Sequence, residues 1–421
     1  MYFWYKVLAY LFYPFSPIYL YLRKLKKKED LIRYKEKLSQ INISRGDGFL
    51  IWLHIASVGE AMSILPLIDN FIKEKKINKI LLTSITLSSG KILEKRFRNN
   101  NKVIHQFLPL DIPILTNKFL NHWKPNLSIF IDSEIWPTLI LQINKKKIPL
   151  VLLNARITKK TFERWKLAKK FAKIIFEKFD LCIASNIESE NFLKILGAKN
   201  IKNYGNLKFS NSENNSKTNL DLGFKNKVKD RKIWCALSTH KPEEKICATT
   251  HLEIKKKFNS VLTVIIPRHI YRVEEINKQL LNLNLKTVLS SELNKVDNKT
   301  DIILVDSYGE TSKFFNISRY VFVGKSMVPS LAKDAGQNPI EPARLGCSIL
   351  HGPNVSNFAE IYNYFEKLGV AKKVKDSNEL SLSLVELFTE IKPKNTEIIK
   401  KIENYGQNIF NNVIIELKKY I

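Results

Sequence analysis

From residue 49 onward, short apolar runs alternate with longer stretches in which apolar residues recur at helical spacing. Apolar runs of this length predict buried strands, and the stretches between them predict amphipathic helices. Strands that alternate with helices in this way predict a parallel sheet with helices on both faces. In the first half we expect strands at 49–54, 79–84, 102–107, 127–131, 149–153 and 180–184, and helices that include 134–145 and 161–177.

A polar stretch, Ser210–Lys217, interrupts this alternation and has the composition of a loop or linker. The alternation then starts again, with strands expected at 233–237, 260–266, 301–305, 319–323 and 348–350. We therefore predict an α/β protein of GT-B type, in which two doubly wound, Rossmann-like domains face a central cleft. Ligands bind such folds at the carboxyl ends of the strands and at domain interfaces.

The same patterns divide the chain into four expected segments. They are a hydrophobic front end with a basic flank (1–28), an N-terminal domain (29–209), a C-terminal domain (210–395) and one helix that packs back on the N-terminal domain (396–421). Residues 1–22 are rich in Tyr, Trp and Phe and carry one charge, Lys6, before the basic block 23–28. This composition is typical of a membrane anchor that lies in the interface or, despite Pro14 and Pro17, spans the bilayer. A buried core helix is the alternative.

Composition narrows the classes of partner. The chain has 69 Lys and Arg against 40 Asp and Glu, a formal charge of +29 that favours phosphorylated substrates, anionic membranes or nucleic acid. Lysine is spread through both halves and acidic residues mark the expected strand ends, so no concentrated basic stripe points to a nucleic-acid partner. The four cysteines and seven histidines show no metal-binding spacing, and we expect no metal or other cofactor.

A carboxylate follows the first expected strand. The run 49–54 leads directly into Ser57, Gly59 and Glu60, which places Glu60 on the turn between a strand and a helix. Small residues there leave room for another molecule to approach the backbone. Glu60 can serve as a general base in such a place, or it can simply favour the N-terminal end of the helix dipole.

Other strand ends in the first half carry charged residues. Glu134 follows the strand 127–131 and either contacts a substrate or favours a helix N-terminus. Arg156 follows 149–153, and its planar guanidinium suits a phosphate or a carboxylate. Lys208 closes this half and can reach a phosphate, although a solvated surface lysine is the alternative.

Strand ends in the second half suit a nucleotide. Ser238 and Thr239 are candidate helix caps, and the backbone amides beyond them can form an anion site. The other candidates are Arg268 and His269, then Tyr308, Gly309 and Glu310, and lastly the loop with Gly336, Asn338 and Glu341. Glu341 can accept hydrogen bonds from ribose hydroxyls or favour the dipole of the helix that it opens.

These segments together resemble the bacterial lipid A transferases of 3-deoxy-D-manno-octulosonic acid (Kdo). The blocks that carry the resemblance occur in family order along nearly the whole chain. They are His54–Glu60, Ser133–Pro137, Asn154–Arg156, Gly205–Phe209, Ser238–His240, Ile266–His269, Asp306–Glu310, Gly336–Ala343 and His351–Phe358.

The resemblance implies inverting transfer of Kdo from CMP-Kdo to the lipid A precursor lipid IVA, in lipopolysaccharide inner-core synthesis at the cytoplasmic face of the cell inner membrane. It implies that Glu60 is the base and that the substrate-binding residues include Ser57, Gly59, Glu134, Arg156 and Lys208, with Glu134 beside the acceptor or the donor sugar. It implies a CMP-holding side made of Ser238, Thr239, Arg268, His269, Tyr308, Gly309, Glu310, Gly336, Asn338, Glu341 and Asn357. A GT-B enzyme that uses a UDP- or ADP-sugar is the rival hypothesis, and a non-enzymatic nucleic-acid-binding protein is a second.

This sequence departs from the family pattern in two places. Ala335 and Gln337 flank Gly336, where relatives usually carry a second glycine and often a histidine before the asparagine. Tyr308 stands where Met or Leu is common. Both departures fall on the segments that the resemblance assigns to the nucleotide.

Overall fold

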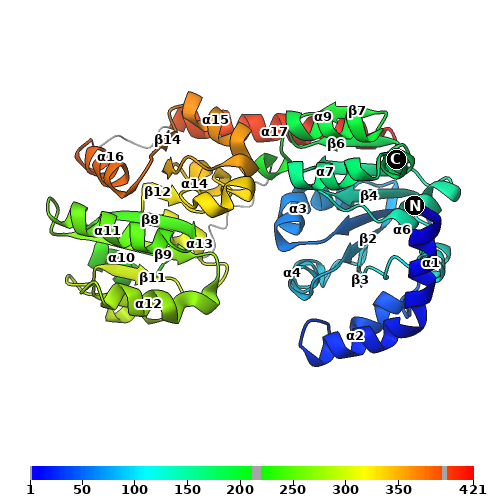
Figure 1. Cartoon of the computed structure of the whole chain (residues 1–421), viewed down its shortest axis with the longest axis horizontal. Coiled ribbons are helices and arrows are strands. Elements are labelled where there is room, and N and C mark those ends of the chain that lie inside the picture. Colours follow the sequence, from blue (N-terminus) through cyan, green and yellow to red (C-terminus); the bar gives the residue numbers. More distant parts are fainter. Residues whose placement is uncertain (1, 211–219, 391–395) are drawn as a thin grey trace. The chain divides into compact units, whose positions relative to one another are not determined.

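The computed structural model describes residues 2–210, 220–390 and 396–421. The chain divides into two compact units: unit 1 comprises residues 1–212 and 405–421, and unit 2 comprises residues 213–404. Each unit contains a seven-stranded parallel sheet with helices packed on it (Figure 1). This confirms the prediction of two Rossmann-like α/β domains of GT-B type. Most of the expected linker 210–217, and the end of the expected domain at 391–395, lie outside the described residues.

The sheet of unit 1 has the strand order β3-β2-β1-β4-β5-β6-β7. The strands are β1 (Phe49–Ile55), β2 (Ile77–Ser84), β3 (Val103–Phe107), β4 (Leu127–Ile131), β5 (Leu150–Ala155), β6 (Leu181–Ala184) and β7 (Ile201–Asn203). The chain winds outward from β1 to β3 and then returns to β4 on the other side of β1. The carboxyl ends of β1 and β4 therefore form the topological switch point, where open α/β sheets bind ligands.

Helices of unit 1 follow the predicted pattern, with two differences. They are α3 (Val58–Lys73), α4 (Leu87–Phe97), α5 (Pro113–Trp123), α6 (Pro137–Lys145), α7 (Lys159–Leu167), α8 (Lys169–Phe176) and α9 (Ile187–Leu196). The helix expected at 134–145 begins at Pro137, because Trp136 is extended and Pro is favoured in a first turn. The helix expected at 161–177 is broken at Ala168, which has non-helical dihedral angles (φ −113°, ψ 39°).

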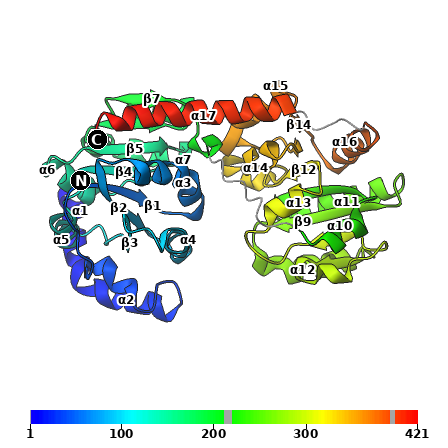
Figure 2. The same ribbon diagram turned by 180° about the vertical axis from the view of Figure 1, so that it is seen from behind.

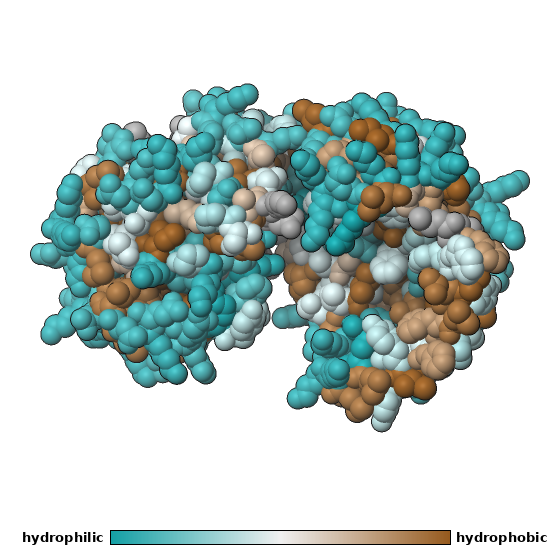
Figure 3. Space-filling view, viewed as in Figure 1, coloured by the Kyte–Doolittle hydropathy of each residue, from teal (hydrophilic) through white to brown (hydrophobic). Residues whose placement is uncertain are grey.

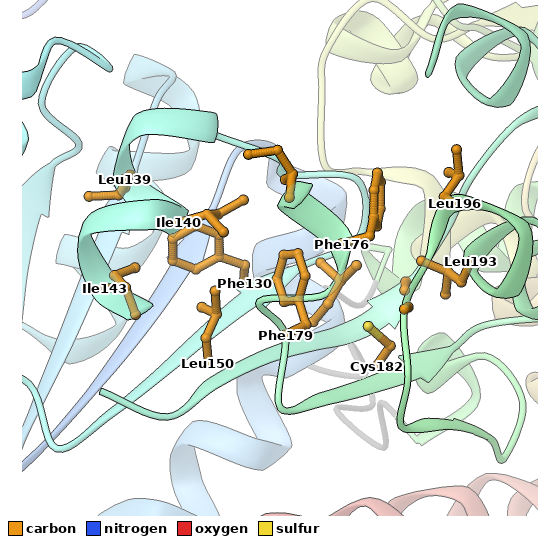
Figure 4. Packing of buried hydrophobic residues seen from close by; sticks show 14 of the residues in the cluster. Phe130, Leu139, Ile140, Ile143, Leu150, Phe176, Phe179, Cys182, Leu193 and Leu196 are labelled. Atoms are coloured by element: carbon orange, nitrogen blue, oxygen red, sulfur yellow. The ribbon is translucent and has the colours of Figure 1, made fainter. Parts of the chain in front are cut away.

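The break at Ala168 allows α8 to pack into the core of unit 1. Phe176 and the following Phe179 belong to one buried cluster with Phe130 of β4 and Ile140 of α6, and Figure 4 shows Phe179 between Phe130 and Phe176. These four side chains are buried. Burying a large apolar side chain stabilises a fold by about 1.5–3 kcal/mol, so this cluster fixes β4 and the turn that follows it.

Unit 2 has the strand order β10-β11-β9-β8-β12-β13-β14, with its switch point at β8 and β12. Its strands are β8 (Lys232–Thr239), β9 (Val261–Pro267), β10 (Thr287–Leu289), β11 (Ile302–Leu304), β12 (Tyr320–Val323), β13 (Ser348–His351) and β14 (Ala371–Lys373). Its helices are α10 (Leu222–Val228), α11 (Glu243–Lys255), α12 (Val273–Leu281), α13 (Thr311–Phe315), α14 (Ile340–Arg344), α15 (Ala359–Lys367) and α16 (Ser377–Thr389). The strands β7, β10 and β14 were not predicted, because each has three residues and too short an apolar run to show a period.

The last helix, α17 (Thr396–Lys418), contributes its second half to unit 1. Figures 1 and 2 show this red helix running alongside β7. Tyr204 donates a hydrogen bond to the Glu416 carboxylate (2.9 Å). Gly406 meets the chain so closely that a Cβ atom would stand 2.1 Å from the carbonyl oxygen of Phe209. This close contact between α17 and the backbone of Phe209 requires glycine at position 406. It places α17 directly over the segment that carries Lys208.

The front end folds as two short helices, α1 (Tyr2–Phe12) and α2 (Ser16–Leu25), joined by a turn at Pro14. Within the described residues, no helix is long and apolar enough to cross a membrane. The apolar side chains of both helices are mostly exposed, and Figure 3 shows hydrophobic surface gathered over α1 and α2. The buried Glu29 carboxylate ties α2 down, since it accepts hydrogen bonds from Arg23 (2.6 Å) and pairs with the buried Lys37 (2.6 Å).

Candidate active site

The turn between β1 and α3 is closed by a reciprocal cap. Ser57 is the N-cap residue, and its hydroxyl accepts a hydrogen bond from the backbone N–H of Glu60 (3.3 Å). The Glu60 carboxylate reaches back to accept from the Ala56 N–H (2.7 Å) and from the Ser57 hydroxyl (2.9 Å). This arrangement resembles a capping box, except that the carboxylate accepts from the N–H of Ala56, the residue before the N-cap. It holds the Glu60 carboxylate in one place at the carboxyl end of β1. Apart from the adjoining residues and the backbone of α3, no atom of the described residues lies within 4 Å of where a Cβ of Gly59 would stand.

The turn after β4 brings two more carboxylates to the same edge, since β4 pairs with β1. Asp132 is buried and adopts a left-handed conformation (φ 60°), which Asp tolerates better than most residues. Glu134 is half-buried, and its Oε2 accepts a hydrogen bond from the Trp136 indole N–H (2.9 Å). The same oxygen lies 3.3 Å from Nε2 of His54 on β1. Asp132 and His54 were not predicted as site residues.

Two cations face these carboxylates. Arg156 follows β5, and Lys208 lies in the short 3₁₀ helix Leu207–Ser210. That helix is held to the end of β5 by Asn154, whose side-chain oxygen accepts from the Leu207 N–H (2.8 Å). Burial lowers the pKa of Lys208, while the charges of Asp132 and Glu60 act in the opposite direction. The structure therefore brings the predicted Glu60, Glu134, Arg156 and Lys208 together around Asp132.

Electrostatics at this edge suit a base. Burial, together with the charges of Asp132 and Glu134, raises the pKa of Glu60 to about 7, against the hydrogen bonds from Ala56 and Ser57. Burial likewise raises the pKa of Asp132, with Lys208 and Arg156 opposing. A general base works best when its pKa lies near the working pH. Of the site carboxylates, Glu60 is the one at a helix N-terminus with open space beside it.

In unit 2, a buried carboxylate joins the loops after β8 and β12. Glu243 begins α11 and is fully buried, and its oxygens accept four backbone N–H bonds. The donors are His240 (2.9 Å), Lys325 (2.7 Å), Ser326 (2.9 Å) and Met327 (2.9 Å). Burial raises the pKa of Glu243, and these N–H bonds oppose the shift. The sequence pattern did not single out Glu243, because a glutamate in a first turn is common.

This clamp supports several residues that were predicted to hold a nucleotide. Ser238 (φ 53°) and the buried Thr239 end β8. Gly336 donates its N–H to the Lys325 carbonyl (2.7 Å), and the Asn357 N–H bonds to the carbonyl of Ala335 (2.9 Å). These residues therefore form one connected set of loops at the carboxyl edge of the sheet.

The remaining predicted residues of unit 2 lie on separate turns. Arg268 is exposed at the end of β9, and the rings of His269 and His240 pack edge to face, 5.5 Å apart. Tyr308 is 73 % exposed, and Gly309 beside it is left-handed (φ 82°) with open space around it. Glu310 forms an ion pair with Lys313 (2.8 Å). Each of these turns follows the carboxyl end of a strand.

The departures at Ala335 and Gln337 fit this loop. Ala335 is fully buried, and the Gln337 carbonyl accepts a hydrogen bond from the Tyr362 hydroxyl (2.9 Å). Gly336 is left-handed (φ 88°), and a Cβ atom there would stand 2.9 Å from the Cα of Val355. The Asn338 side chain accepts from the Ile340 N–H (3.1 Å), while Glu341 lies in the first turn of α14. One glycine is therefore enough to make this turn.

Comparison with known proteins identifies the family. Residues 28–211 match a family model described as 3-deoxy-D-manno-octulosonic-acid transferase (kdotransferase). A 3-deoxy-D-manno-octulosonic acid transferase of Rickettsia bellii is 33% identical over 404 residues, which cover 96% of this chain and 93% of the relative. The Haemophilus influenzae transferase is 30% identical and covers 74% of this chain and 72% of its own length.

A solved structure adds a likeness of fold alone. The UDP-GlcNAc 2-epimerase from Neisseria meningitidis, bound to UDP-GlcNAc, superposes with a TM-score of 0.58 at 15% identity. The superposition covers 88% of this chain and all of that one. The sequence relatives show the family: the chain belongs to the 3-deoxy-D-manno-octulosonic acid (Kdo) transferase family of glycosyltransferases.

Proposed function

We propose that this Kdo transferase moves Kdo from CMP-Kdo to lipid IVA with inversion, and that Glu60 is the general base. The observation that carries the proposal is the Glu60 carboxyl group at the switch point of unit 1. It has a pKa of about 7, a fixed orientation and open space beside Gly59. These are the properties that a proton acceptor needs near neutral pH.

The reaction needs one base. An acceptor hydroxyl attacks the anomeric carbon of Kdo, and its proton passes to a carboxylate oxygen of Glu60. The bond between that carbon and the CMP phosphate oxygen breaks, and its electron pair leaves on the phosphate, which needs little acid assistance. The new bond forms on the opposite face, so the configuration inverts.

Charges in unit 1 suit an anionic acceptor and donor. Kdo carries a carboxylate, lipid IVA carries phosphates, and Arg156 and Lys208 supply positive charge beside Glu60. Fixed charges at such a site stabilise an oxocarbenium-like transition state without reorganising. In unit 2, the exposed Arg268 side chain at the end of β9 supplies positive charge that suits the CMP phosphate.

Product analysis tests this function directly. We expect mass spectrometry to show addition of Kdo to lipid IVA when CMP-Kdo is supplied, and no product with UDP-GlcNAc or an ADP-sugar. Product from a UDP- or ADP-sugar in place of CMP-Kdo would overturn the assigned donor. Transfer to an acceptor other than lipid IVA would overturn the assigned acceptor.

We also propose that the protein works at the cytoplasmic side of the cell inner membrane, with α1 and α2 lying in the interface. Trp4 and Leu8 of α1 are 66 % and 65 % exposed, and the basic block 23–28, which begins in the last turn of α2, would meet anionic lipid.

Vesicle sedimentation tests this placement. We expect the protein to sediment with phosphatidylglycerol vesicles and the double variant Trp4→Ser, Leu8→Ser to sediment several-fold less. Tyr271→Ser is the matched control, since Tyr271 is 81 % exposed in unit 2. Equal sedimentation of the wild type and the double variant would contradict the placement.

A further inference from the structure

We propose that Trp52, Thr83 and His54 form a buried relay that positions the Glu134 carboxylate beside Glu60 and thereby controls when Glu60 can accept a proton. The inference rests on the proposed role of Glu60 as the base. In this relay the three residues are positioning residues, because their effect reaches the reaction through Glu134.

The relay is a continuous chain of short contacts between neighbouring strands. The Trp52 indole N–H donates to the Thr83 hydroxyl oxygen (2.8 Å). That oxygen lies 3.0 Å from Nδ1 of His54, and Nε2 of His54 lies 3.3 Å from Oε2 of Glu134. All three relay side chains are fully buried, and His54 on β1 stands opposite Thr83 on β2 in the sheet.

The donors and acceptors available in the relay decide the direction of its hydrogen bonds. An indole N–H can only donate, so the Thr83 oxygen is the acceptor toward Trp52, and its own proton remains to be placed. Its two possible acceptors are Nδ1 of His54 at 3.0 Å and the Leu53 carbonyl at 3.5 Å. At the other end of the relay, Nε2 of His54 faces the Glu134 carboxylate, which only accepts. His54 therefore carries its proton on Nε2, and the unprotonated Nδ1 accepts the proton of the Thr83 hydroxyl.

Glu134 consequently receives two N–H donors on one oxygen, one from His54 and one from Trp136 (2.9 Å). A carboxylate suits this position, because it only accepts. The charged groups that act on Glu60 come from three elements. Asp132 and Glu134 after β4 and Lys208 in the 3₁₀ helix 207–210 act on Glu60 directly. Arg156 after β5 acts indirectly, because its charge acts on Asp132 and Lys208.

The relay is more than an ordinary buried network because of where it ends. Two other buried histidines also end on carboxylates, His251 on Asp301 and His351 on Glu366. His54 differs from them because its carboxylate, Glu134, is half-buried at the site and carries a charge that raises the pKa of Glu60. If the relay is cut, Glu134 loses a fixed donor, and Glu60 is expected to release its proton at lower pH.

The pH profile of kcat/KM for lipid IVA distinguishes a relay that positions Glu134 from a buried network that only fills the core. Thr83→Val keeps the shape of the side chain and removes the hydroxyl. We expect the acidic limb of the kcat/KM profile of this variant to move to lower pH by about half a unit. A shift of that size corresponds to the partial loss of one nearby charge at an effective dielectric of ~20. Thr83→Ser should restore the wild-type profile. Thr116→Val is the matched control, since Thr116 is fully buried in α5 and bonds to the Ile112 carbonyl.

A double variant shows whether the effect passes through Glu134. We expect Glu134→Gln to move the limb in the same direction, and Thr83→Val to add nothing when Glu134 is already Gln. An unmoved limb in Thr83→Val, or shifts that add in the double variant, would overturn the relay.

The protonation of His54 can be read from the wild type without any activity. We expect nitrogen-15 NMR of the imidazole, assigned by its absence in His54→Phe, to show a proton on Nε2 and none on Nδ1. A proton on Nδ1 would overturn the assigned direction. Failure of Kdo transfer by the wild type would instead count against the proposed function, and the two failures are therefore distinguishable.

Discussion

Replacing Glu60 with Gln is expected to lower kcat for Kdo transfer by about 10²- to 10⁴-fold, the usual contribution of a general base. The amide keeps the size of the side chain and can still accept from the Ala56 N–H, so the turn after β1 should hold. It cannot take the proton of the acceptor hydroxyl. CMP-Kdo binding, measured by calorimetry, should stay within a few-fold of the wild type.

Glu188→Gln is the matched control for this substitution. Glu188 also lies in the first turn of a helix, α9, after the N-cap residue Asn186, and it is exposed. A carboxylate that only favours a helix dipole contributes about 0.3–1 kcal/mol to stability and nothing to turnover. Equal and small effects in Glu60→Gln and Glu188→Gln would show that Glu60 has a structural role alone.

The base also sets a pH dependence with a definite sign. Only the ionised form of Glu60 accepts a proton, and its pKa is about 7. The kcat/KM value should therefore rise with pH to about 7, fall roughly tenfold per unit below that and level off above it. The residual activity of Glu60→Gln should lack this limb.

The second large effect is expected at Glu243 in unit 2. Glu243→Gln replaces one accepting oxygen with an NH₂ group that faces backbone N–H donors. Hydrogen bonds to a charged group contribute about 1.5–3 kcal/mol each. Losing the equivalent of one or two of them should weaken CMP binding by roughly 100-fold, since 1.4 kcal/mol is tenfold in affinity.

CMP affinity is expected to fall because Glu243 clamps the loop after β8 to the loop after β12. Glu243 connects His240, beside Ser238 and Thr239, with Lys325, whose carbonyl holds Gly336. When these loops separate, the donor KM should rise much more than kcat at saturating donor falls. Calorimetry with CMP and steady-state kinetics measure the two quantities.

Glu253→Gln is the control, since Glu253 lies on the same helix α11 with an exposed side chain paired to Lys256 (2.7 Å). It should bind CMP as the wild type does. If Glu243→Gln behaved like Glu253→Gln, the clamp would have no part in donor binding.

Much of the fold was predictable from local pattern. Apolar runs of five or more residues, such as 49–54 and 127–131, mark buried strands because a parallel strand is covered on both faces. Strands such as β7 escaped prediction because their three residues do not lie in a longer apolar run, whereas the equally short β11 lies within the apolar run 301–305 and was predicted. Ala168 interrupts a good helical pattern, and the burial of α8 in the core of unit 1 accounts for the break.

The sequence by itself determined which residues lie at the ends of the predicted strands, and so placed Glu60, Glu134 and Arg156 at one edge of a sheet. Only the tertiary structure decided their partners. His54 meets Glu134 because β1 pairs with β4, and it meets Thr83 because β1 also pairs with β2. Glu243 clamps the loop after β12 because β12 lies beside β8, although about 80 residues separate them in sequence. Side-chain spacing along a strand is local, whereas the order of strands in a sheet is set by how the whole chain packs.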